Sequence, residues 1–499
     1  MLENDPHELL AAIKSIQERV EDQAARTLAR WTPRLNRPPF GHSAENLARY
    51  LALRKLDLRP VEAALAPWGL ASLGRCESRV LPSLQAIIAN LEMICRSNTE
   101  TQRPARADFR SGSETLSANT DALFGQRDAG RRTRILVTLD IAAATDPDYV
   151  AGLVRAGMDC ARINCAHDGP NVWQAMIDNV RRQAAAAGRD VRVLMDLAGP
   201  KIRTDTVVTP KKGMKRKKAR KVAPGDRILL AFEDTGDRKD PPFRATCSAP
   251  EVLRQVPAGA MVAIKDGLIR GRVEAVRPDG LVVVVERTPP EGQSLKPEKG
   301  INFPGTPLAV SPLTPADLAD LDFVVEHADI VSYSFVQRPE DIALLQDEIA
   351  RRRPDRAAMP IVAKVETQLA FTNLPELIVQ AAGANPFAVM IARGDLAVEI
   401  GYERLSEVQE EILWLCEAAH VPVIWATQVL ESLVKLGMPS RGEFTDAAMA
   451  ERAECVMLNK GPYIAEGITV LDNVLRRMEG HRLKRSAQLR PLKAWDGAT

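Results

Sequence analysis

The stretch FAVMIARGDLAVEI, residues 387–400, combines two kinds of secondary structure. Its first part is a short apolar run with β-branched residues, which is typical of a buried strand. Its second part places Gly394 at the expected start of a short helix, where free backbone N–H groups bind anions such as a carboxylate. A buried strand followed by a helix is the unit from which sheets of parallel strands are built.

The same unit recurs along the chain after residue 131. Short apolar runs alternate with amphipathic, helix-length segments, and the runs lie at 134–140, 160–165, 191–197, 329–335, 360–366, 387–393, 421–428 and 455–460. Eight such units are the number that closes a (β/α)8 barrel. The pattern therefore predicts an α/β fold of the TIM-barrel class.

An insertion interrupts the third unit of this predicted barrel. Residues 204–298 contain short alternating strands separated by Pro-Gly-Asp and Pro-Asp-Gly turns. We expect a small β-barrel domain here, with the larger barrel assembled from 132–203 and 299–480. Because the insertion follows a barrel strand, it would lie at the end where active sites form and could act as a lid.

The first quarter of the chain has a different texture. Its apolar residues recur with the three-four spacing of one helix face, at Leu9, Leu10, Ile13, Ile16, Val20, Ala24, Leu28 and Trp31. Further helices are expected over 43–64, with Ser43 as a cap, and over 79–96. These signals predict a helical extension at 1–97, a polar linker at 98–131 and, after the barrel, a short tail at 481–499.

Composition argues against several classes of protein. The 499 residues carry 67 basic and 65 acidic side chains, and a net charge of +2 is not that of a dedicated nucleic-acid binder. No apolar run approaches the roughly 20 residues that span a bilayer, and MLENDPHELL lacks the features of a signal peptide. The seven cysteines form no CxxC pair. The sequence favours a soluble, cytoplasmic protein of several domains.

Polar residues collect where the expected strands end, which is where barrels of this class perform their chemistry. Glu366 and Asp395 follow neighbouring strands, and Mg²⁺ commonly takes one or two protein carboxylates together with substrate phosphate. Lys364 and Arg162 add positive charge that could stabilise a phosphoryl group or an enolate. Other polar residues at the strand ends are Asn164, Asp196, Ser334, Arg393 and Thr427.

These motifs, in this order and spacing, resemble those of the pyruvate kinase family. They are RTRILVTLD, AGMDCARINCAHDG, MDLAGPKIRT, KDGLI, KGINFPG, SFVQRPEDI, AKVET, MIARGDLAVEI and PVIWATQVLES, and they cover about residues 131–480. The resemblance implies a (β/α)8 barrel with an inserted lid. It also implies transfer of the phosphoryl group of phosphoenolpyruvate to ADP, which gives pyruvate and ATP.

The resemblance implies roles for single residues at the reacting end of the site. Glu366 and Asp395 would hold Mg²⁺, or Mn²⁺ in its place. Lys364 would stabilise the phosphoryl group and the enolate in the transition state, and Arg162 would hold the phosphoryl group.

It also implies how the rest of the substrates would be held. The backbone at Gly394 and the hydroxyl of Thr427 would bind the substrate carboxylate, and Thr427 would lie near the face on which the enolate is protonated. Asn164, His167 and Arg203 match positions on the side of the nucleotide phosphates.

The family's monovalent-cation site is altered in this chain. Asn164 and Asp196 match the family, but Ala166 and Leu197 stand where it uses Ser and Thr. Lys201 stands where potassium-dependent members have an acidic residue, and a fixed ammonium can supply the charge of a bound K⁺. We therefore expect that K⁺ is not required.

Other segments also depart from the family pattern. The loops MLNKGPYI and TLDIAAA differ after the last and the first strand, and the chain stops about twenty residues after the last expected barrel helix, where family members continue into an effector-binding domain. Control through that domain is not implied, and for a homo-oligomer the helical extension is the candidate contact. The basic run at 211–221 has no aromatic residue to stack on a base, so a solvated loop is expected rather than a nucleic-acid site.

Two other functions stay open at this point. The altered loops and the helical extension would suit a catalytically weak relative that serves as a binding or regulatory protein. A Mg²⁺-dependent lyase acting on a pyruvate enolate would use the same metal, but it would have little use for the long insertion or for Lys364.

Overall fold

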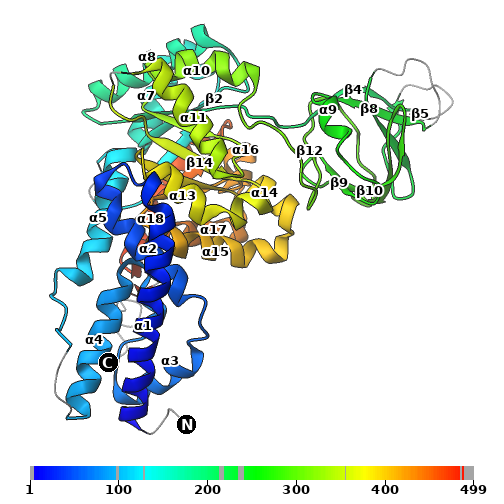
Figure 1. Ribbon diagram of the computed structural model, residues 1–499. Helices are drawn as coiled ribbons and strands as arrows, with labels where there is room; N and C mark the ends of the chain where they lie inside the picture. Colours follow the sequence, from blue (N-terminus) through cyan, green and yellow to red (C-terminus); the bar gives the residue numbers. More distant parts are fainter. Residues whose placement is uncertain are drawn as a thin grey trace, which may run out of the picture.

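The centre of the molecule is a closed barrel of eight parallel strands, as the sequence predicts (Figure 1). The computed structural model describes residues 5–96, 101–126, 130–212, 218–233, 241–354, 356–483 and 486–487. Within these, each barrel strand pairs with the barrel strands before and after it in the chain. The strands are β1 (Arg134–Thr138), β2 (Cys160–Asn164), β3 (Arg192–Asp196), β13 (Ile330–Tyr333), β14 (Ile361–Val365), β15 (Phe387–Ala392), β16 (Val423–Ala426) and β17 (Cys455–Leu458).

Helices link the barrel strands and cover the outside of the barrel. Thr314 and Ser440 start two of them with a capping box, because each hydroxyl accepts a hydrogen bond from the backbone three residues on. The helices are α6 (Ala142–Thr145), α7 (Pro147–Ala156), α8 (Pro170–Ala186), α10 (Pro315–His327), α11 (Pro339–Arg352), α12 (Gln368–Thr372), α13 (Leu374–Ala382), α14 (Arg393–Ile400), α15 (Tyr402–Ala418), α16 (Glu431–Leu436), α17 (Arg441–Ala450) and α18 (Ile464–Glu479).

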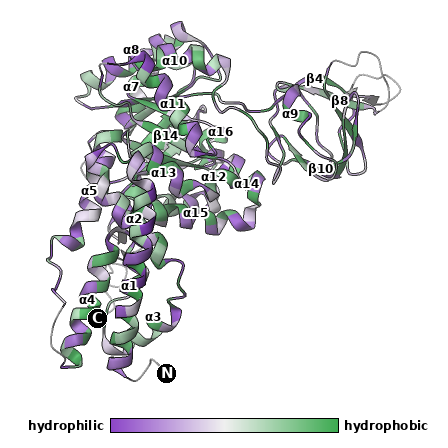
Figure 2. Cartoon of the chain, viewed as in Figure 1, coloured by the Kyte–Doolittle hydropathy of each residue, from purple (hydrophilic) through white to green (hydrophobic). Residues whose placement is uncertain are grey.

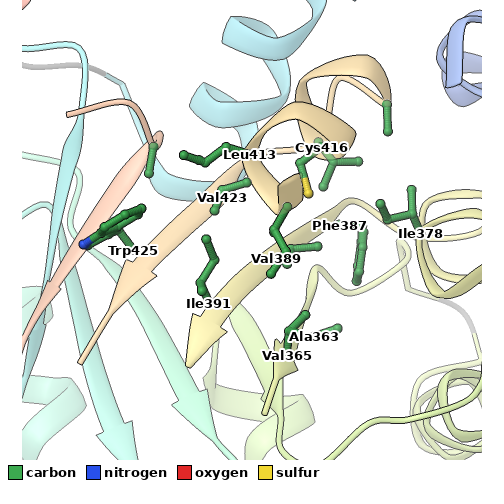
Figure 3. Close-up of a cluster of buried hydrophobic side chains, with 14 of the residues drawn as sticks. Ala363, Val365, Ile378, Phe387, Val389, Ile391, Leu413, Cys416, Val423 and Trp425 are labelled. Atoms are coloured by element: carbon green, nitrogen blue, oxygen red, sulfur yellow. The ribbon is translucent and has the colours of Figure 1, made fainter. Parts of the chain in front are cut away.

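Side chains on the barrel strands alternate between two apolar cores. The odd-numbered residues of β14, β15 and β16 pack outward against the helices (Figure 3), and the even-numbered apolar ones fill the inside of the barrel. On β14 this alternation puts Val362 inside, and the next two positions of the same parity are Lys364 and Glu366. Inward positions near the carboxyl end of a strand open on the barrel mouth, so these polar side chains collect there.

The insertion forms its own domain beyond the carboxyl-terminal end of the barrel, and two segments join it to the barrel (Figure 1). It has a separate apolar core and a sheet of strand order β12-β9-β10-β11-β7-β8-β4. An isolated bridge between Arg203 and Gly300 joins the two edges of this sheet next to the barrel. Its elements are β4 (Thr204–Val208), β7 (Arg227–Ala231), β8 (Phe243–Cys247), α9 (Pro250–Leu253), β9 (Met261–Ile264), β10 (Ile269–Arg277), β11 (Gly280–Arg287) and β12 (Ile301–Asn302).

Two short hairpins complete the strands. One consists of β5 (Lys211–Lys212) and β6 (Lys218–Ala219), and the other of β18 (Arg482–Leu483) and β19 (Ser486–Ala487). Residues 213–217 of the basic run and residues 488–499 of the expected tail lie outside the described residues. Among those described, no helix combines the length and the apolar character needed to cross a membrane.

The N-terminal residues form a helical arm that extends from one side of the barrel (Figure 1). Its helices are α1 (Pro6–Trp31), α2 (Gly41–Leu53), α3 (Arg59–Leu65) and α4 (Val80–Ile94). The predicted apolar stripe of α1 packs on α2 and α4, so it is buried within the chain and not presented to a second copy. Figure 2 shows both apolar and polar residues along each of these helices. Trp31 and Arg34 anchor the arm to the barrel by hydrogen bonds to Glu376 of α13.

The expectation that Ser43 caps a helix is wrong. The helix α2 begins at Gly41, and the side chain of Ser43 is buried against His420 of the barrel, with 2.9 Å between its Oγ and Nδ1. Nε2 of His420 lies 3.0 Å from the carbonyl oxygen of Ser78, so Nε2 donates and Nδ1 accepts. Burial lowers the pKa of His420 to about 4, which keeps the ring neutral in this interface. A tertiary contact therefore uses the hydroxyl that the sequence pattern assigned to a cap.

The expected linker at 98–131 is also wrong in part, because residues Asp108–Phe124 form helix α5. Few large apolar residues mark this helix in the sequence, but Leu123 and Phe124 at its end join the core inside the barrel. The guanidinium of Arg134 on β1 donates to the carbonyl oxygen of Gly125 and to Asp121, which ties the end of α5 to the barrel. Helix α5 thus belongs to the barrel floor.

Candidate active site

Arg162, Asp196 and Lys364 form an ionic cluster inside the barrel mouth. The Asp196 carboxylate accepts hydrogen bonds from two nitrogens of Arg162, with 2.9 Å from Nε to Oδ2, and Lys364 Nζ lies 3.5 Å from the same oxygen. Lys364 Nζ also donates to Ser334 Oγ over 2.7 Å, and Arg162 donates to Thr138 Oγ1 over 3.0 Å. Strands β2 and β14, which are separated by β3 and β13, therefore direct two cations to one carboxylate, and a hydroxyl fixes each cation further.

The charges in this cluster stabilise one another. Burial by itself would raise the pKa of Asp196, but Lys364 and Arg162 outweigh burial and hold that pKa below its ordinary value. Burial would lower the pKa of Lys364, but Asp196 and Glu366 reverse the effect and raise it. Lys364 is therefore a permanent cation in a site from which water is largely excluded.

Glu366 and Asp395 lie on the neighbouring edge of the mouth. Oε2 of Glu366 accepts the backbone N–H of Phe335 over 2.6 Å, and its Oε1 lies 3.1 Å from Lys364 Nζ. Burial raises the pKa of Glu366, Lys364 opposes this rise, and the charge of Asp395 adds to it. Two carboxylates that repel each other at the edge of a polar cleft fit a divalent cation, and Mg²⁺ needs no more than two from a protein. Among the described residues no group of three or more acidic, histidine or cysteine side chains offers a richer site.

Lys201 contacts Asp395 and not the expected monovalent-cation site. Its Nζ lies 2.8 Å from Oδ1 and 3.0 Å from Oδ2 of that carboxylate. At the expected cation site, Asn164 Oδ1 accepts the backbone N–H of Ala166 over 3.2 Å, and the buried Oδ1 of Asp196 makes no hydrogen bond. The structure thus brings Asn164 and Asp196 together at the strand ends, while Lys201 faces the carboxylate pair.

Gly394 and Thr427 form the end of the site next to Asp395. Gly394 is the second residue of α14, as the sequence predicts, and its N–H donates to Thr427 Oγ1 over 2.9 Å. Thr427 has φ of +64°, which is strained for a β-branched residue. Arg393 holds this backbone because its guanidinium donates to the carbonyl oxygens of Ala426 and Thr427. A hydroxyl held beside the backbone N–H groups at the start of a helix is an arrangement that suits the binding of a carboxylate.

A cleft of about 260 Å³ opens beside Arg162. Asn164 and His167 line it, as expected for residues that share one subsite. Arg203 does not line it, because that residue lies at the start of the lid, where it forms the bridge to Gly300. The three residues expected on the nucleotide side are therefore divided between the barrel and the lid.

Sequence reasoning missed several residues of this cleft. Lys435 on α16 and Asn459 and Lys460 after β17 also line it. The altered loop MLNKGPYI contained the signal, since it places Asn459 and Lys460 just past a strand end, where barrels of this class carry polar site residues. Thr138 was missed for a different reason. A threonine within an apolar strand gives no sign of its contact with Arg162.

The comparisons with known proteins agree with this geometry. Residues 130–468 match the family model of the pyruvate kinase barrel domain. The chain is 32% identical over 389 residues to human pyruvate kinase PKLR, which corresponds to 72% of this chain and 63% of that protein. It is 33% identical over 362 residues to a pyruvate kinase of Mycobacterium tuberculosis, which covers 70% of both chains, and 29% identical to one of Bacillus licheniformis, with 70% of this chain and 57% of the relative covered.

The match to the family model covers more than half of the chain and includes every barrel strand. The chain spans about three fifths of the length of the human and Bacillus relatives. The barrel, the cation cluster and the carboxylate pair described above lie within the matched residues. The chain therefore belongs to the pyruvate kinase family.

Proposed function

We propose that this protein transfers the phosphoryl group of phosphoenolpyruvate to ADP, with Mg²⁺ or Mn²⁺, and so forms pyruvate and ATP. The observation that carries the proposal is the convergence of Lys364, Arg162 and the pair Glu366 and Asp395 at one barrel mouth. This set supplies fixed positive charge for a phosphoryl group and oxygen ligands for a divalent ion. The proteins named pyruvate kinase that this chain resembles match it over 389 and 362 residues.

The substrate carboxylate would lie at the start of α14. The start of a helix offers backbone N–H groups to an anion, and Gly394 leaves room for a ligand because it has no side chain. The Thr427 hydroxyl, which accepts the Gly394 N–H, has its own proton free to donate to that carboxylate. The pyruvate end of the substrate is thereby fixed close to Asp395.

The phosphoryl group would lie between Arg162 and Lys364. Both cations are held in place before any substrate arrives, so they stabilise developing charge with little reorganisation. Glu366 and Asp395 would hold the divalent ion, which when bound neutralises phosphate charge. The raised pKa of Lys364 favours its charged form, so we assign it an electrostatic role and not the transfer of the proton that the enolate needs.

The nucleotide would occupy the cleft lined by Asn164 and His167, next to Arg162. In this position an incoming phosphate would lie next to Arg162, the residue assigned to the transferred phosphoryl group. Arg203 would reach the nucleotide only from the lid, so its contribution depends on the position of the lid.

We also propose that the reaction needs no K⁺. Two of the four expected oxygen ligands are replaced by Ala166 and Leu197, and Lys201 brings an ammonium into the barrel mouth, where it pairs with Asp395. The rate in tetramethylammonium buffer should equal the rate in K⁺ buffer. Many-fold stimulation by added K⁺ would contradict this part of the proposal.

The activity is tested by a coupled assay for pyruvate formed from phosphoenolpyruvate and ADP. The wild-type chain should be active, and Lys364→Met should lower the rate about 10²- to 10³-fold or more. Lys55→Met, which removes an exposed cation from the arm, is the matched control and should retain the wild-type rate. Activity in neither the wild type nor the control would favour a binding or regulatory role. Pyruvate formed without ADP, from a larger carbon compound, would favour a lyase.

The assembly and the location of the protein follow from the same proposal. We infer a homo-oligomer, and because the stripe of α1 is buried, its contact would use other surfaces, such as the exposed apolar side chains Leu436, Met438 and Tyr463 near the barrel mouth. Light scattering that gives the mass of one chain would contradict an oligomer. We infer a cytoplasmic location from the metabolites involved, and cell fractionation tests it.

A further inference from the structure

Lys201 makes an ion pair that the sequence does not predict. Its ammonium contacts both carboxylate oxygens of Asp395, at 2.8 Å and 3.0 Å, although the two residues lie 194 positions apart in the chain. The two side chains are 22% and 17% exposed, so water screens this pair only in part. The positive charge of Lys201 also acts on Glu366, whose pKa it lowers against the effect of burial. Lys201 therefore pairs directly with one carboxylate of the proposed metal site, that of Asp395.

The ion pair and the metal compete for the same oxygens. Mg²⁺ coordinates oxygen at about 2.0–2.1 Å, and an ammonium that spans both oxygens of Asp395 blocks the lone pairs that the ion would use. An ammonium at this distance would also repel the divalent ion. We propose that Lys201 is an internal counter-ion that occupies the divalent-metal position in the metal-free protein and must leave Asp395 when the metal binds. The proposal rests on the proposed function only in assigning the metal to Glu366 and Asp395.

The position of Lys201 connects this exchange to the lid. Lys201 lies in the first of the two segments that join the lid to the barrel, and Gly300 lies in the second. A Cβ at Gly300 would come within 3.0 Å of Lys201 Cε, so the lysine side chain passes directly across the second segment. A cavity of about 320 Å³ on the same side, lined by Lys201, Phe335 and Glu399, gives the released side chain room to move. The released ammonium then remains near the site as a positive charge in place of K⁺.

The test measures binding of Mn²⁺ alone, without substrates, to the full chain by electron paramagnetic resonance or calorimetry. Lys201→Met should bind Mn²⁺ about tenfold more tightly than the wild type, since the metal no longer displaces an ammonium. Lys201→Arg keeps the charge and should stay within about threefold of the wild type. Lys296→Met removes an exposed cation near the second segment and is the matched control, with unchanged affinity.

Asp395→Asn separates the failure of this inference from the failure of the metal assignment. If Asp395→Asn abolishes Mn²⁺ binding while Lys201→Met binds like the wild type, the metal site is correct and the counter-ion inference is overturned. If Asp395→Asn binds Mn²⁺ like the wild type, the metal lies elsewhere and both fall. Near-wild-type thermal unfolding of each variant would show that an altered affinity does not come from misfolding, and Lys201→Gln would replace Lys201→Met if the latter does not fold.

Discussion

The pKa of Glu399 shows how burial and a neighbouring charge act on a single carboxyl group near this site. It lies on α14, four residues after Asp395, and its side chain lines the cavity at the lid segments. Burial, with the added repulsion of Asp395, raises the pKa of Glu399 to about 7. Near neutral pH a fraction of the molecules therefore carries a proton at this position.

This pKa predicts a dependence of stability on pH. Between about pH 4.5 and pH 7 the folded state keeps a proton on Glu399 that the unfolded state has lost, so the free energy of unfolding falls as pH rises through this window. The loss is at most about 3 kcal/mol. Glu399→Gln should remove this dependence, which thermal unfolding from pH 5 to pH 8 in a metal chelator will measure for both proteins. Parallel curves for wild type and variant would contradict the raised pKa.

The site residues differ in how far the sequence could place them. Lys364 and Glu366 follow the inward parity of β14, and the same parity argument places Arg162 and Asp196, so strand alternation alone predicts their convergence. Lys201 obeys no such period because it lies in a connecting segment, and only the fold shows that it reaches Asp395. The alternation of inward and outward positions predicts which way a strand residue faces. It cannot predict a contact made by a segment between two domains.

At the scale of elements, the packing of helix α5 depends on a close contact of its Gly112 with Ser78 and His420. A Cβ at Gly112 would lie 2.1 Å from the carbonyl oxygen of Ser78 and 2.6 Å from Nε2 of His420. The sequence suggested no helix here because Gly112 and the polar residues around it have no apolar period. The helix exists because its backbone fits against the arm and the barrel.

We predict that Gly112→Ala destabilises the protein even though alanine is the better helix former. The new methyl group must push α5 away from Ser78 and His420, and overpacking of this kind costs about 1–3 kcal/mol or more. Gly152→Ala in α7 is the matched control, since its Cβ would meet nothing within 4 Å. That control should be neutral or stabilising by up to about 1 kcal/mol. Thermal unfolding measures both, and an unchanged midpoint for Gly112→Ala would show that α5 is not packed as described.

The barrel strands could be predicted from a property of their sequence that α5 does not have. All eight strands were found because each is buried on both faces and therefore reads as an apolar run. Helix α1 was found from its stripe, which is buried against other arm helices. Helix α5 is polar on most of its surface, and its buried face includes Gly112 and Thr120 as well as apolar side chains, so local sequence could not distinguish it from a linker.

At the scale of the whole molecule, the arm and the barrel share one apolar core. Their buried apolar residues form a single continuous core, which includes Leu9 and Trp31 of the arm as well as the outward faces of the barrel strands. Polar contacts cross the same boundary, among them Asn46 of α2, which donates to the carbonyl oxygen of Ala418 over 2.8 Å. The lid, with a separate core, is the part that can move as a body.

Because α5 closes the inside of the barrel and the other N-terminal helices do not, two truncations should have different outcomes. Deleting residues 1–104 removes the arm helices but keeps α5, so Leu123 and Phe124 still close the inside of the barrel. Deleting residues 1–125 also removes these two side chains and two acceptors of the Arg134 guanidinium, Asp121 and the carbonyl oxygen of Gly125. The barrel floor is then open, and the buried guanidinium keeps the carbonyl oxygen of Arg132 as an acceptor. Burying a large apolar side chain contributes about 1.5–3 kcal/mol, and the second deletion takes two such side chains out of the core inside the barrel, which the first leaves intact.

We expect the protein without residues 1–104 to remain folded with a lower thermal midpoint, and the protein without residues 1–125 to aggregate. Circular dichroism and light scattering on the two purified chains measure this, with the full chain as reference. Equal stability of the two truncated proteins would contradict the role of α5 as the barrel floor. Wild-type stability of the shorter deletion would instead show that the arm only rests on the barrel. Because the barrel mouth lies at the other end of the strands from α5, loss of activity in either case would report loss of the barrel and not of a substrate contact.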